Sequence, residues 1–317
     1  MSEADELACL LMCVPGWAVY PAVGATYTVC MCSGRYRGVI ETGHGGIDLR
    51  GRPLVMGVLN VTPDSFSDGG DFFSPASAQR QAERLVAEGA DIIDIGGEST
   101  RPGGEPVPAD EQLRRILPAI EAARRASDSV PISVDTRLGS VAEAALDAGA
   151  DLVNDVFALR DDAELARVVA GRDVPVILMH MQGRPATMQQ DPTYVDVVSE
   201  ICSFLQERMD AAERAGIDRE RIIIDPGIGF GKTTQHNLTI LRELAALLEL
   251  GRPVLVGPSR KRFIGQVLGI DEPKRRQWGT AAVVACAVAA GAHIVRVHDV
   301  AAMRQVATMA WTIRQGT

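Results

Sequence analysis

Short apolar runs alternate with polar loops and amphipathic stretches from Pro53 to the end of the chain. The runs are rich in valine and isoleucine, as strands buried on both faces of a parallel sheet are. Eight such runs occur, in the segments PLVMGVLNV, DIIDIGG, PISVDT, DLVNDV, VPVILMH, RIIIDPG, PVLVGPS and HIVRVHD. The pattern therefore predicts eight parallel strands, each joined to the next by a connection that crosses back over the sheet.

The stretches between these runs have the apolar spacing of amphipathic helices. Residues 76–90 (ASAQRQAERLVAEGA) are one example, and residues 108–126 and 138–150 are two others. The pair Gly-Ala stands before an apolar run in EGADIID, AGADLVN and AGAHIVR. Glycine is common just after the last turn of a helix, so each pair indicates a helix that ends and leads into the next strand.

Eight strand–helix units in succession predict a (β/α)8 barrel, a fold that takes about 250 residues. A doubly wound open sheet has the same local signals and is the alternative. The number of strands favours the barrel, and so do the polar residues at nearly every strand end, because in a barrel these ends meet at one mouth. These residues are Asn60, Glu98 with Ser99 and Thr100, Asp135, Asn154, His180, Asp225, Ser259 to Lys261, and Arg296 with His298.

Residues 1–50 precede this pattern and are expected to form an N-terminal extension, with the barrel domain at residues 51–317. The apolar segment of this extension is broken by prolines and glycines, and the preceding MSEADE is acidic, unlike the start of a signal peptide. We therefore predict no membrane span. The natural chain could even begin at Met31.

The cysteines of the extension raise the question of a zinc site. Cys9, Cys13, Cys30 and Cys32 have the spacings C-x3-C and C-x-C, which are unusual for zinc, so we expect no metal there. Cys202 and Cys286 lie in helical patterns and are expected to be core thiols. No disulfide framework is indicated, and a reducing cytoplasm is the expected compartment.

Charge narrows the candidate functions. The 317 residues have a net charge of −9 and a pI near 5.2, which argues against broad nucleic-acid binding. Any site for an anion must therefore be a local cluster of basic groups.

The loop DPGIGFGKT, residues 225–233, resembles a phosphate-binding P-loop at its end. Gly231, Lys232 and Thr233 fit that motif, but Pro226 takes the place of its first glycine and has no N–H to donate. A dinucleotide G-x-G-x-x-G interpretation fails because its last position is Lys232. The segment is therefore a strand-end loop of another kind, and it begins with a carboxylate, Asp225.

The strand ends carry one group of residues suited to a planar heterocycle. Asp135, Asn154 and Asp225 offer carboxylate and amide groups that pair with N–H and C=O edges, and Lys261 can donate to the ring. Two of them also have a structural interpretation: Asp135 could cap the next helix, and Asn154 could be a turn residue whose hydrogen bonds are satisfied locally. Their recurrence at consecutive strand ends favours a binding role.

A second group is cationic. Arg101, Arg296 and His298 suit the oxygens of a phosphate, although His298 could instead cap the last helix. Magnesium could join the phosphates with Asn60 as a ligand, because Mg²⁺ needs only one or two protein oxygens when the substrate supplies others. The sequence thus predicts an anion pocket beside a heterocycle pocket.

Eight ordered segments resemble the motifs of the dihydropteroate synthase family of folate biosynthesis. They are MGVLNVTPDSFSDGG (56–70), DIGGESTRPGG (94–104), SVDT (133–136), VND (153–155), LMHMQGRPATMQ (178–189), DPGIGFGK (225–232), VGPSRKRFIG (256–265) and RVHDV (296–300). The resemblance covers the chain from about Pro53 onward. It implies a TIM-barrel transferase, usually a homodimer, that joins p-aminobenzoate to 6-hydroxymethyl-7,8-dihydropterin diphosphate with the help of Mg²⁺, giving 7,8-dihydropteroate and diphosphate.

The resemblance also implies residue roles. The pterin-binding set would be Asp135, Asn154, Met179, Asp225 and Lys261. The diphosphate set would be Asn60, Arg101, Arg296 and His298, with Asn60 linked to magnesium. The p-aminobenzoate pocket would comprise Phe66, Thr100, Pro102, Phe230 and Arg262. Catalysis would depend on Asp135, Lys261, Arg296 and His298.

One position departs from the family pattern. Many bacterial members carry serine after the lysine of the SRK motif, where it helps to bind the p-aminobenzoate carboxylate, and this chain has Arg262. The arginine could pair with that carboxylate directly or crowd the pocket.

Two other functions remain as alternatives. A pterin-binding methyltransferase domain shares the barrel but does not need a diphosphate pocket. A non-catalytic pterin-binding paralogue would tend to lose the loop residues that this chain keeps.

Overall fold

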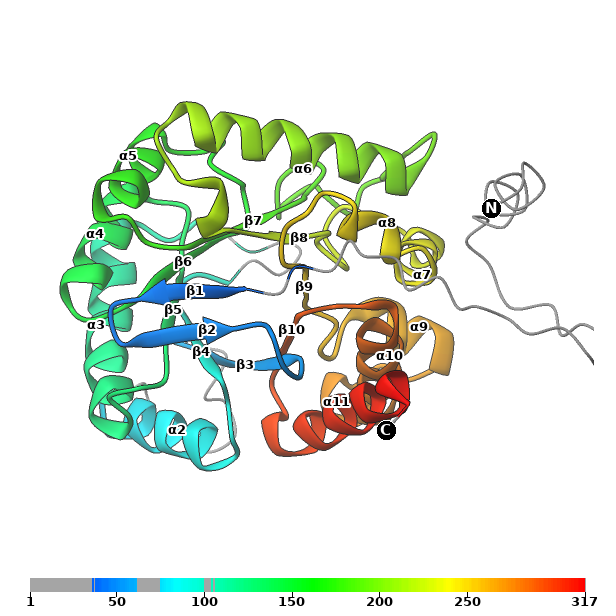
Figure 1. Cartoon of the computed structure of the whole chain (residues 1–317), viewed down its shortest axis with the longest axis horizontal. Helices are drawn as coiled ribbons and strands as arrows, with labels where there is room; N and C mark the ends of the chain where they lie inside the picture. The colour runs from blue at the N-terminus through cyan, green and yellow to red at the C-terminus, as the bar shows by residue number, and fades with distance from the viewer. Residues whose placement is uncertain (1–35, 37, 62–74, 100–103, 105, 317) are drawn as a thin grey trace, which may run out of the picture. The chain divides into compact units, whose positions relative to one another are not determined.

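The computed structural model of the chain describes residue 36, residues 38–61, 75–99 and 104, and residues 106–316. These residues belong to one compact unit, Gly34–Thr317. Its main sheet has eight strands in the order β8-β7-β6-β5-β4-β3-β10-β9, with parallel pairing throughout. A bridge between Ile224 and Val254 brings the two ends of the sheet together (Figure 1). The predicted barrel is confirmed, and the open doubly wound sheet is excluded.

Each predicted apolar run forms one strand of the barrel. The strands are β3 (Leu54–Asn60), β4 (Ile92–Gly96), β5 (Ile132–Asp135), β6 (Leu152–Asp155), β7 (Val176–Met179), β8 (Ile222–Asp225), β9 (Leu255–Val256) and β10 (Ile294–Val297).

Helices surround these strands. They are α2 (Pro75–Ala87), α3 (Ala109–Ala126), α4 (Gly139–Asp147), α5 (Ala163–Arg172), α6 (Val197–Arg214), α7 (Thr234–Arg242), α8 (Ala245–Leu248), α9 (Arg262–Leu268), α10 (Gln277–Ala290) and α11 (Val300–Gln315), with 3-10 turns η2 (Arg219–Arg221) and η3 (Pro273–Arg276). Gly89, Gly149 and Gly291 have φ angles of 87°, 105° and 112°, which glycine adopts without strain, and they follow helix ends as predicted. Among the described residues, no helix combines the length and apolarity that crossing a bilayer requires.

The barrel interior has an apolar lower layer. Side chains alternate along each strand, so one set faces the helices and the other faces the barrel axis. The inward set near the strand starts is buried and apolar; it consists of Met56, Ile92, Leu152, Ile177, Ile223, Leu255 and Ile294. The outward valines and isoleucines pack against the helices in a second, larger cluster.

An antiparallel hairpin covers this lower layer. Its strands are β1 (Val39–Thr42) and β2 (Gly45–Asp48), which Figure 1 shows lying across the ring of barrel strands. Ile40, Ile47 and Leu49 are buried against the lower layer. These residues belong to the segment expected to be an extension, and they complete the core of the barrel at its lower end. The cysteines at positions 9, 13, 30 and 32 lie outside the described residues.

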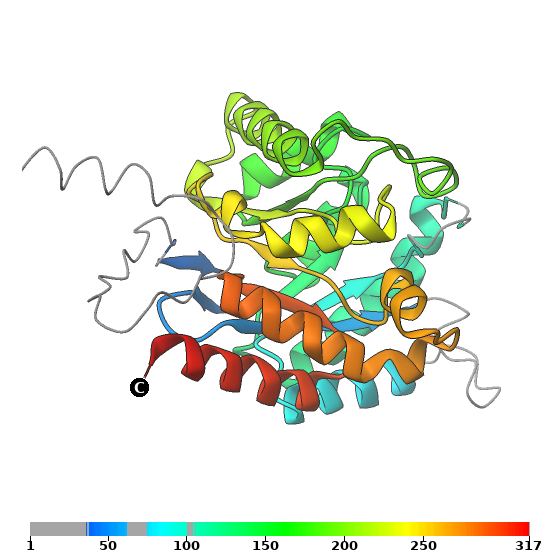
Figure 2. The same ribbon diagram turned by 90° about the vertical axis from the view of Figure 1, so that its right-hand side faces the viewer.

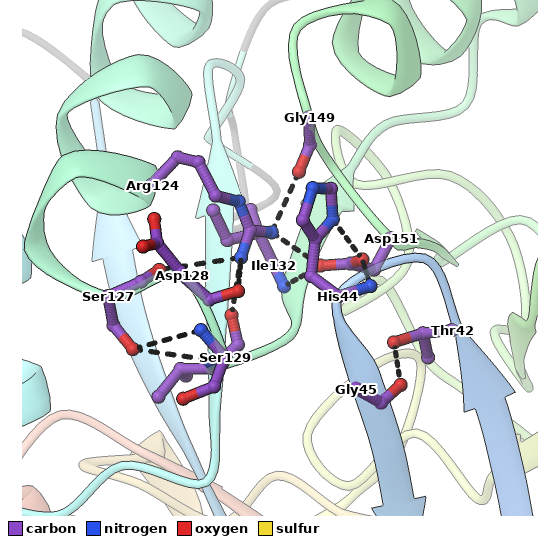
Figure 3. A network of polar contacts seen from close by, with 11 residues as sticks. Thr42, His44, Gly45, Arg124, Ser127, Asp128, Ser129, Ile132, Gly149 and Asp151 are labelled. Atoms are coloured by element: carbon purple, nitrogen blue, oxygen red, sulfur yellow. Dashed lines mark hydrogen bonds and ion pairs between the residues drawn. The ribbon is translucent and has the colours of Figure 1, made fainter.

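A buried carboxylate fastens the hairpin turn to the barrel (Figure 3). The side chain of Asp151, just before β6, is 0% exposed. It accepts hydrogen bonds from the backbone N–H and Nδ1 of His44 at 3.0 and 2.8 Å, from Nη2 of Arg124 at 2.6 Å, and from the N–H of Ile132 at 2.8 Å. One side chain therefore joins the hairpin turn, α3, β5 and β6.

Helix α10 has an apolar outer face as well as an apolar inner one. Trp278 is 83% exposed there, and Cys286 is exposed on the same helix. The expectation that Cys286 is a core thiol is wrong, because α10 is apolar all round and its periodicity gave no sign of the buried side. Cys202 is half-buried and packs against the core.

We expect Asp151→Ala to lower the free energy of unfolding by about 3–5 kcal/mol, because it leaves the buried Arg124 without its carboxylate. His44→Ala keeps the Asp151–Arg124 pair and should cost only about 1 kcal/mol. Urea denaturation followed by circular dichroism measures both. Equal losses in the two variants would show that the buried ion pair is not what stabilises this end of the barrel.

Candidate functional site

The C-terminal ends of the barrel strands open into a cavity of about 1080 Å³. Its lining includes residues that the sequence predicts for the site: Asn60, Asp135, Phe230, Lys261, Arg262, Arg296 and His298. Asn154, Met179 and Asp225 are buried at the ends of the neighbouring strands β6, β7 and β8. The structure thus gathers segments distant in sequence at one mouth. Phe66, Thr100, Arg101 and Pro102 lie outside the described residues.

The polar residues form the upper layer of the barrel interior. Each stands two positions after an inward residue of the layer below, and so points to the same side of its strand. The pairs are Ile92 and Asp94, Ser133 and Asp135, Leu152 and Asn154, Ile177 and Met179, Ile223 and Asp225, and Ile294 and Arg296. Except at Ser133 the lower residues are therefore apolar, and except at Met179 the upper ones are polar, which places the polar groups at the end of the barrel where active sites of this fold lie.

Arg296 is the centre of this layer. Its Nε donates to Oδ2 of Asp94 at 2.6 Å, and its Nη2 donates to Oδ2 of Asp135 at 3.1 Å. Asn154 donates from Nδ2 to the same Asp94 carboxylate at 3.3 Å. One guanidinium from β10 therefore links two carboxylates on β4 and β5.

The sequence interpretation missed Asp94, which is 0% exposed. Asp94 lies inside the run DIIDIGG rather than at its end, so it was not counted among the strand-end residues. The alternation of side chains along a strand was the available signal, because Asp94 stands two residues after Ile92 and therefore points to the same side of the strand.

The carboxyl of Asp135 lies in surroundings that disfavour its negative charge. Burial raises the pKa of its carboxyl, and the negative charge of Asp94 raises that pKa further, while Arg296 opposes both effects. The helix-cap alternative is excluded, because the N-cap of α4 is Leu138 and has no side-chain hydrogen bond. Asp135 thus faces the cavity and binds Arg296.

The structural alternatives for Asn154 and His298 fail as well. Asn154 lies within β6 and not in a turn. The N-cap of α11 is Asp299, while Nδ1 of His298 lies 2.9 Å from the hydroxyl of Ser259. This contact connects the ends of β9 and β10 beside the cavity.

Phe230 and Lys261 line a second side of the cavity, and the buried Asp225 lies at the end of β8, from which the Phe230 loop continues. Oδ1 of Asp225 accepts from the N–H of Gly227 at 2.7 Å, and burial raises the pKa of Asp225 to about 6 against the opposing effects of this bond and of nearby lysines. Nζ of Lys261 lies 3.8 Å from the centre of the Phe230 ring. Met179 and Phe230 belong to one apolar cluster. This side of the cavity thus offers a carboxylate, a cation and an apolar face to a flat ligand.

The residues at the cavity rim bear on anion and metal binding. Asn60 ends β3, and the exposed Arg262 begins α9. Among the described residues, no group of three or more histidine, cysteine or acidic side chains is arranged to hold a metal ion. In this part of the chain, a metal ion would therefore need ligands from a bound substrate or from water in addition to those of the protein.

Comparison with known sequences shows close relatives. The model of the family described as "Pterin binding enzyme" matches residues 56–298. The dihydropteroate synthase of Synechocystis sp. is 51% identical over 259 residues, which cover 82% of this chain and 89% of the relative. The dihydropteroate synthase of Bacillus subtilis is 46% identical over 272 residues, 86% of this chain and 91% of the relative.

Solved structures show the same relationship in three dimensions. The dihydropteroate synthase of Xanthomonas albilineans with 4-aminobenzoic acid has a TM-score of 0.82 and 47% identity, covering 88% of this chain and 98% of that one. A structure from the same organism in complex with 7,8-dihydropteroate has a TM-score of 0.79 and 45% identity, covering 88% and 100%.

Gly227 allows the loop after β8 to approach the loop after β7. Its φ is 68°, and a Cβ atom there would lie 1.9 Å from the carbonyl oxygen of His180. Gly251 has nearly the same φ, 69°, but a Cβ atom there would meet nothing within 4 Å. An alanine at Gly251 is therefore the matched control for an alanine at Gly227.

We expect Gly251→Ala to cost about 1–2 kcal/mol of stability from backbone strain alone. Gly227→Ala should cost clearly more, because the backbones of the two loops must also separate. Chemical denaturation measures the two losses, and similar values would contradict the close approach at Gly227.

Proposed function

The chain belongs to the pterin-binding enzyme family, and we infer from this membership and from the cavity that it is a transferase of the dihydropteroate synthase type. It condenses p-aminobenzoate with 6-hydroxymethyl-7,8-dihydropterin diphosphate and releases 7,8-dihydropteroate and diphosphate in folate biosynthesis. The single observation that carries this conclusion is the polar layer around Arg296, which stands at the mouth of a barrel whose relatives bear this name.

We propose that the pterin ring lies over the polar layer. Asp225, Asp135 and Asn154 offer acceptors and an amide for the N–H and C=O edges of the ring, and Lys261 donates from the side. Met179 supplies an apolar contact for the flat face of the ring. The burial of Asp225, Asn154 and Met179 supports the assignment, because a ring that reaches them is removed from water.

The diphosphate takes the cationic side of the cavity. Arg296 and His298 come from the end of β10, Asn60 comes from the end of β3, and Arg101 joins them on the basis of the sequence resemblance. Asn60 is the residue that would hold magnesium together with the diphosphate oxygens, and the ion would offset negative charge on the leaving group.

The reaction needs positioning and electrostatics more than proton transfer. The carbon–oxygen bond of the pterin methylene breaks, and its electron pair leaves with the diphosphate. The amine of p-aminobenzoate then forms a bond to this carbon and loses a proton. The carboxylate of Asp135 stabilises the positive charge that develops on the pterin, because Asp135 belongs to the polar layer over which the ring lies. Attack by the amine before diphosphate departs, detected by isotope exchange, would contradict this dissociative order.

The p-aminobenzoate pocket lies toward the cavity rim. Phe230 and Arg262 line the cavity there, and the sequence resemblance adds Phe66, Thr100 and Pro102. The exposed Arg262 can pair with the benzoate carboxylate, in place of the serine that many relatives use.

A homodimer through α10 and α11 is the assembly that the surface supports. These helices lie side by side on one face of the barrel (Figure 2). Trp278, Met309 and Ile313 are 83%, 60% and 69% exposed on them, and such an apolar face suits a second copy of the chain. Sedimentation velocity tests this, and a monomer at micromolar concentration would exclude it.

We expect the purified chain to form 7,8-dihydropteroate from the pterin diphosphate and p-aminobenzoate, and to do so faster with magnesium than with a chelator. A coupled assay of diphosphate release measures the rate. A non-catalytic paralogue would bind the pterin without releasing diphosphate, and a methyltransferase domain would likewise release no diphosphate. The absence of product with both substrates and magnesium present would refute the proposed function.

We expect Arg262→Ser to raise the KM for p-aminobenzoate by a few-fold at nearly constant kcat, because an exposed ion pair contributes about 0.2–1 kcal/mol. The response to sulfonamides, which compete for the same pocket, should change in parallel. Arg275→Ser removes an exposed cation that does not line the cavity and is the control. An unchanged KM and an unchanged inhibitor response in Arg262→Ser would show that this side chain points away from the substrate.

A further inference from the structure

Lys232 is a buried lysine beside the site that none of the roles above uses. Its side chain is buried, with 3% exposed. It lies in the segment DPGIGFGKT, which does not fit the P-loop motif, so the motif assigns no ligand to this lysine. Its Nζ lies 2.9 Å from the carbonyl oxygen of Phe230, 2.9 Å from Nδ1 of His180 and 3.4 Å from the carbonyl oxygen of His180. A buried amine with such partners requires an explanation.

The acceptors around Lys232 match an ammonium ion. Two carbonyl oxygens and one ring nitrogen face the three N–H bonds of the ammonium, which has no acceptor of its own. Nδ1 of His180 must therefore accept, which places the ring hydrogen on Nε2. Burial, Lys232 and Arg160 lower the pKa of His180 to about 2, so this ring stays neutral and able to accept.

Lys232 connects the loops that follow β7 and β8. His180 comes directly after Met179 at the end of β7, and Phe230 lies in the loop after β8. Two further bonds join these loops, from the hydroxyl of Tyr194 to the carbonyl of Gly231 at 2.7 Å and from Nε2 of Gln189 to the carbonyl of Gly229 at 2.8 Å. The ammonium of Lys232 is thus one of three links between the loops that follow Met179 and contain Phe230, the two apolar residues assigned to the pterin subsite, and it is the only charged one of the three.

The charge of Lys232 also acts on Asp225. Burial raises the pKa of Asp225 to about 6, and the charges of Lys261, Lys232 and Arg296 limit that rise. Burial also lowers the pKa of Lys232 to about 7, while Asp225 raises it and Lys261 lowers it. The charged and titratable groups that face this pair are Lys261, Arg296, His180, Arg160 and His236.

We propose that Lys232 is a positioning residue for the pterin: its ammonium fixes the loops after β7 and β8, and its charge helps to keep the Asp225 carboxylate ionised. This inference rests on the proposed function, because it takes the N–H edge of the pterin as the ligand of Asp225. An ionised carboxylate accepts hydrogen bonds from such an edge, whereas a protonated one loses part of that capacity.

The test is the pH dependence of pterin binding. The affinity of wild type and of Lys232→Met for 6-hydroxymethylpterin is measured by titration calorimetry from about pH 5.5 to about pH 8. Removal of a neighbouring positive charge raises the pKa of Asp225, so the variant loses affinity most at low pH. We expect its loss relative to wild type to be at least about threefold larger at the acid end, since a shift of one full pKa unit is worth about tenfold.

Two further variants separate charge from contact. Lys232→Gln keeps an N–H donor for the Phe230 carbonyl without the charge, so it should show the pH dependence of the methionine variant and bind more tightly than that variant near pH 8. Arg242→Met, on the exposed side of α7, changes the net charge equally and should behave as wild type. A loss of affinity that is the same at every pH in both Lys232 variants would overturn the proposal.

Wild-type measurements keep the inference testable if the variants do not fold. Binding of 6-hydroxymethylpterin to wild type should weaken as the pH falls through about 7 and about 6, the pKa values to which burial raises Asp135 and Asp225, and the comparison with Lys232→Met isolates the part that belongs to Asp225. A constant wild-type affinity over this range would overturn the proposal. Turnover by wild type in the same buffers tests the proposed function separately, because an active enzyme with pH-independent pterin binding refutes only the role of Lys232.

Discussion

The site depends on one partly buried arginine that lies between two acids. A guanidinium inside a barrel is stable only if carboxylates and hydrogen bonds compensate its loss of water. Arg296 on β10 reaches across β3 to Asp94 on β4 and Asp135 on β5, and Asn154 donates to Asp94 from β6. These contacts fix the rotation of β10 relative to β4, β5 and β6. The ligand groups at the mouth are therefore in place before any substrate arrives.

The lower half of the barrel makes this polar layer possible. The apolar side chains beneath it exclude water from below, and the hairpin β1–β2 covers them with Ile40 and Ile47. Asp151 and Arg124 form an ion pair at that end as well, but their partners are the hairpin turn and the start of β5, so that pair holds segments together and binds no ligand. Stability is concentrated at one end of the strands and binding chemistry at the other.

Much of this arrangement could be predicted from the sequence because strands in a barrel have simple rules. Eight valine- and isoleucine-rich runs with glycines before them gave the fold, and polar strand ends gave Asp135, Asn154, Asp225 and Arg296 as neighbours. Asp94 was missed since it stands inside an apolar run, where only side-chain parity reveals its direction. The hairpin was missed because its strands are four residues each and are separated by glycines. The prediction for Cys286 was wrong because a helix that is apolar on every side gives no periodic signal. No role was predicted for Lys232, because a motif cannot show which acceptors surround a side chain.

The two carboxylates beside Arg296 are suited to stabilise a positive charge. Asp94 and Asp135 share one guanidinium, so the local charge is negative in a place where burial disfavours it, and this is why the pKa of Asp135 is raised. On the proposed reaction, a cation forms on the pterin methylene as diphosphate leaves. That cation offsets the repulsion between the two carboxylates. The neutral pterin ring of the substrate does not, so the two carboxylates stabilise the transition state more than the bound substrate. Because the chain folds with this repulsion already built in, no reorganisation of the protein is needed when the charge develops.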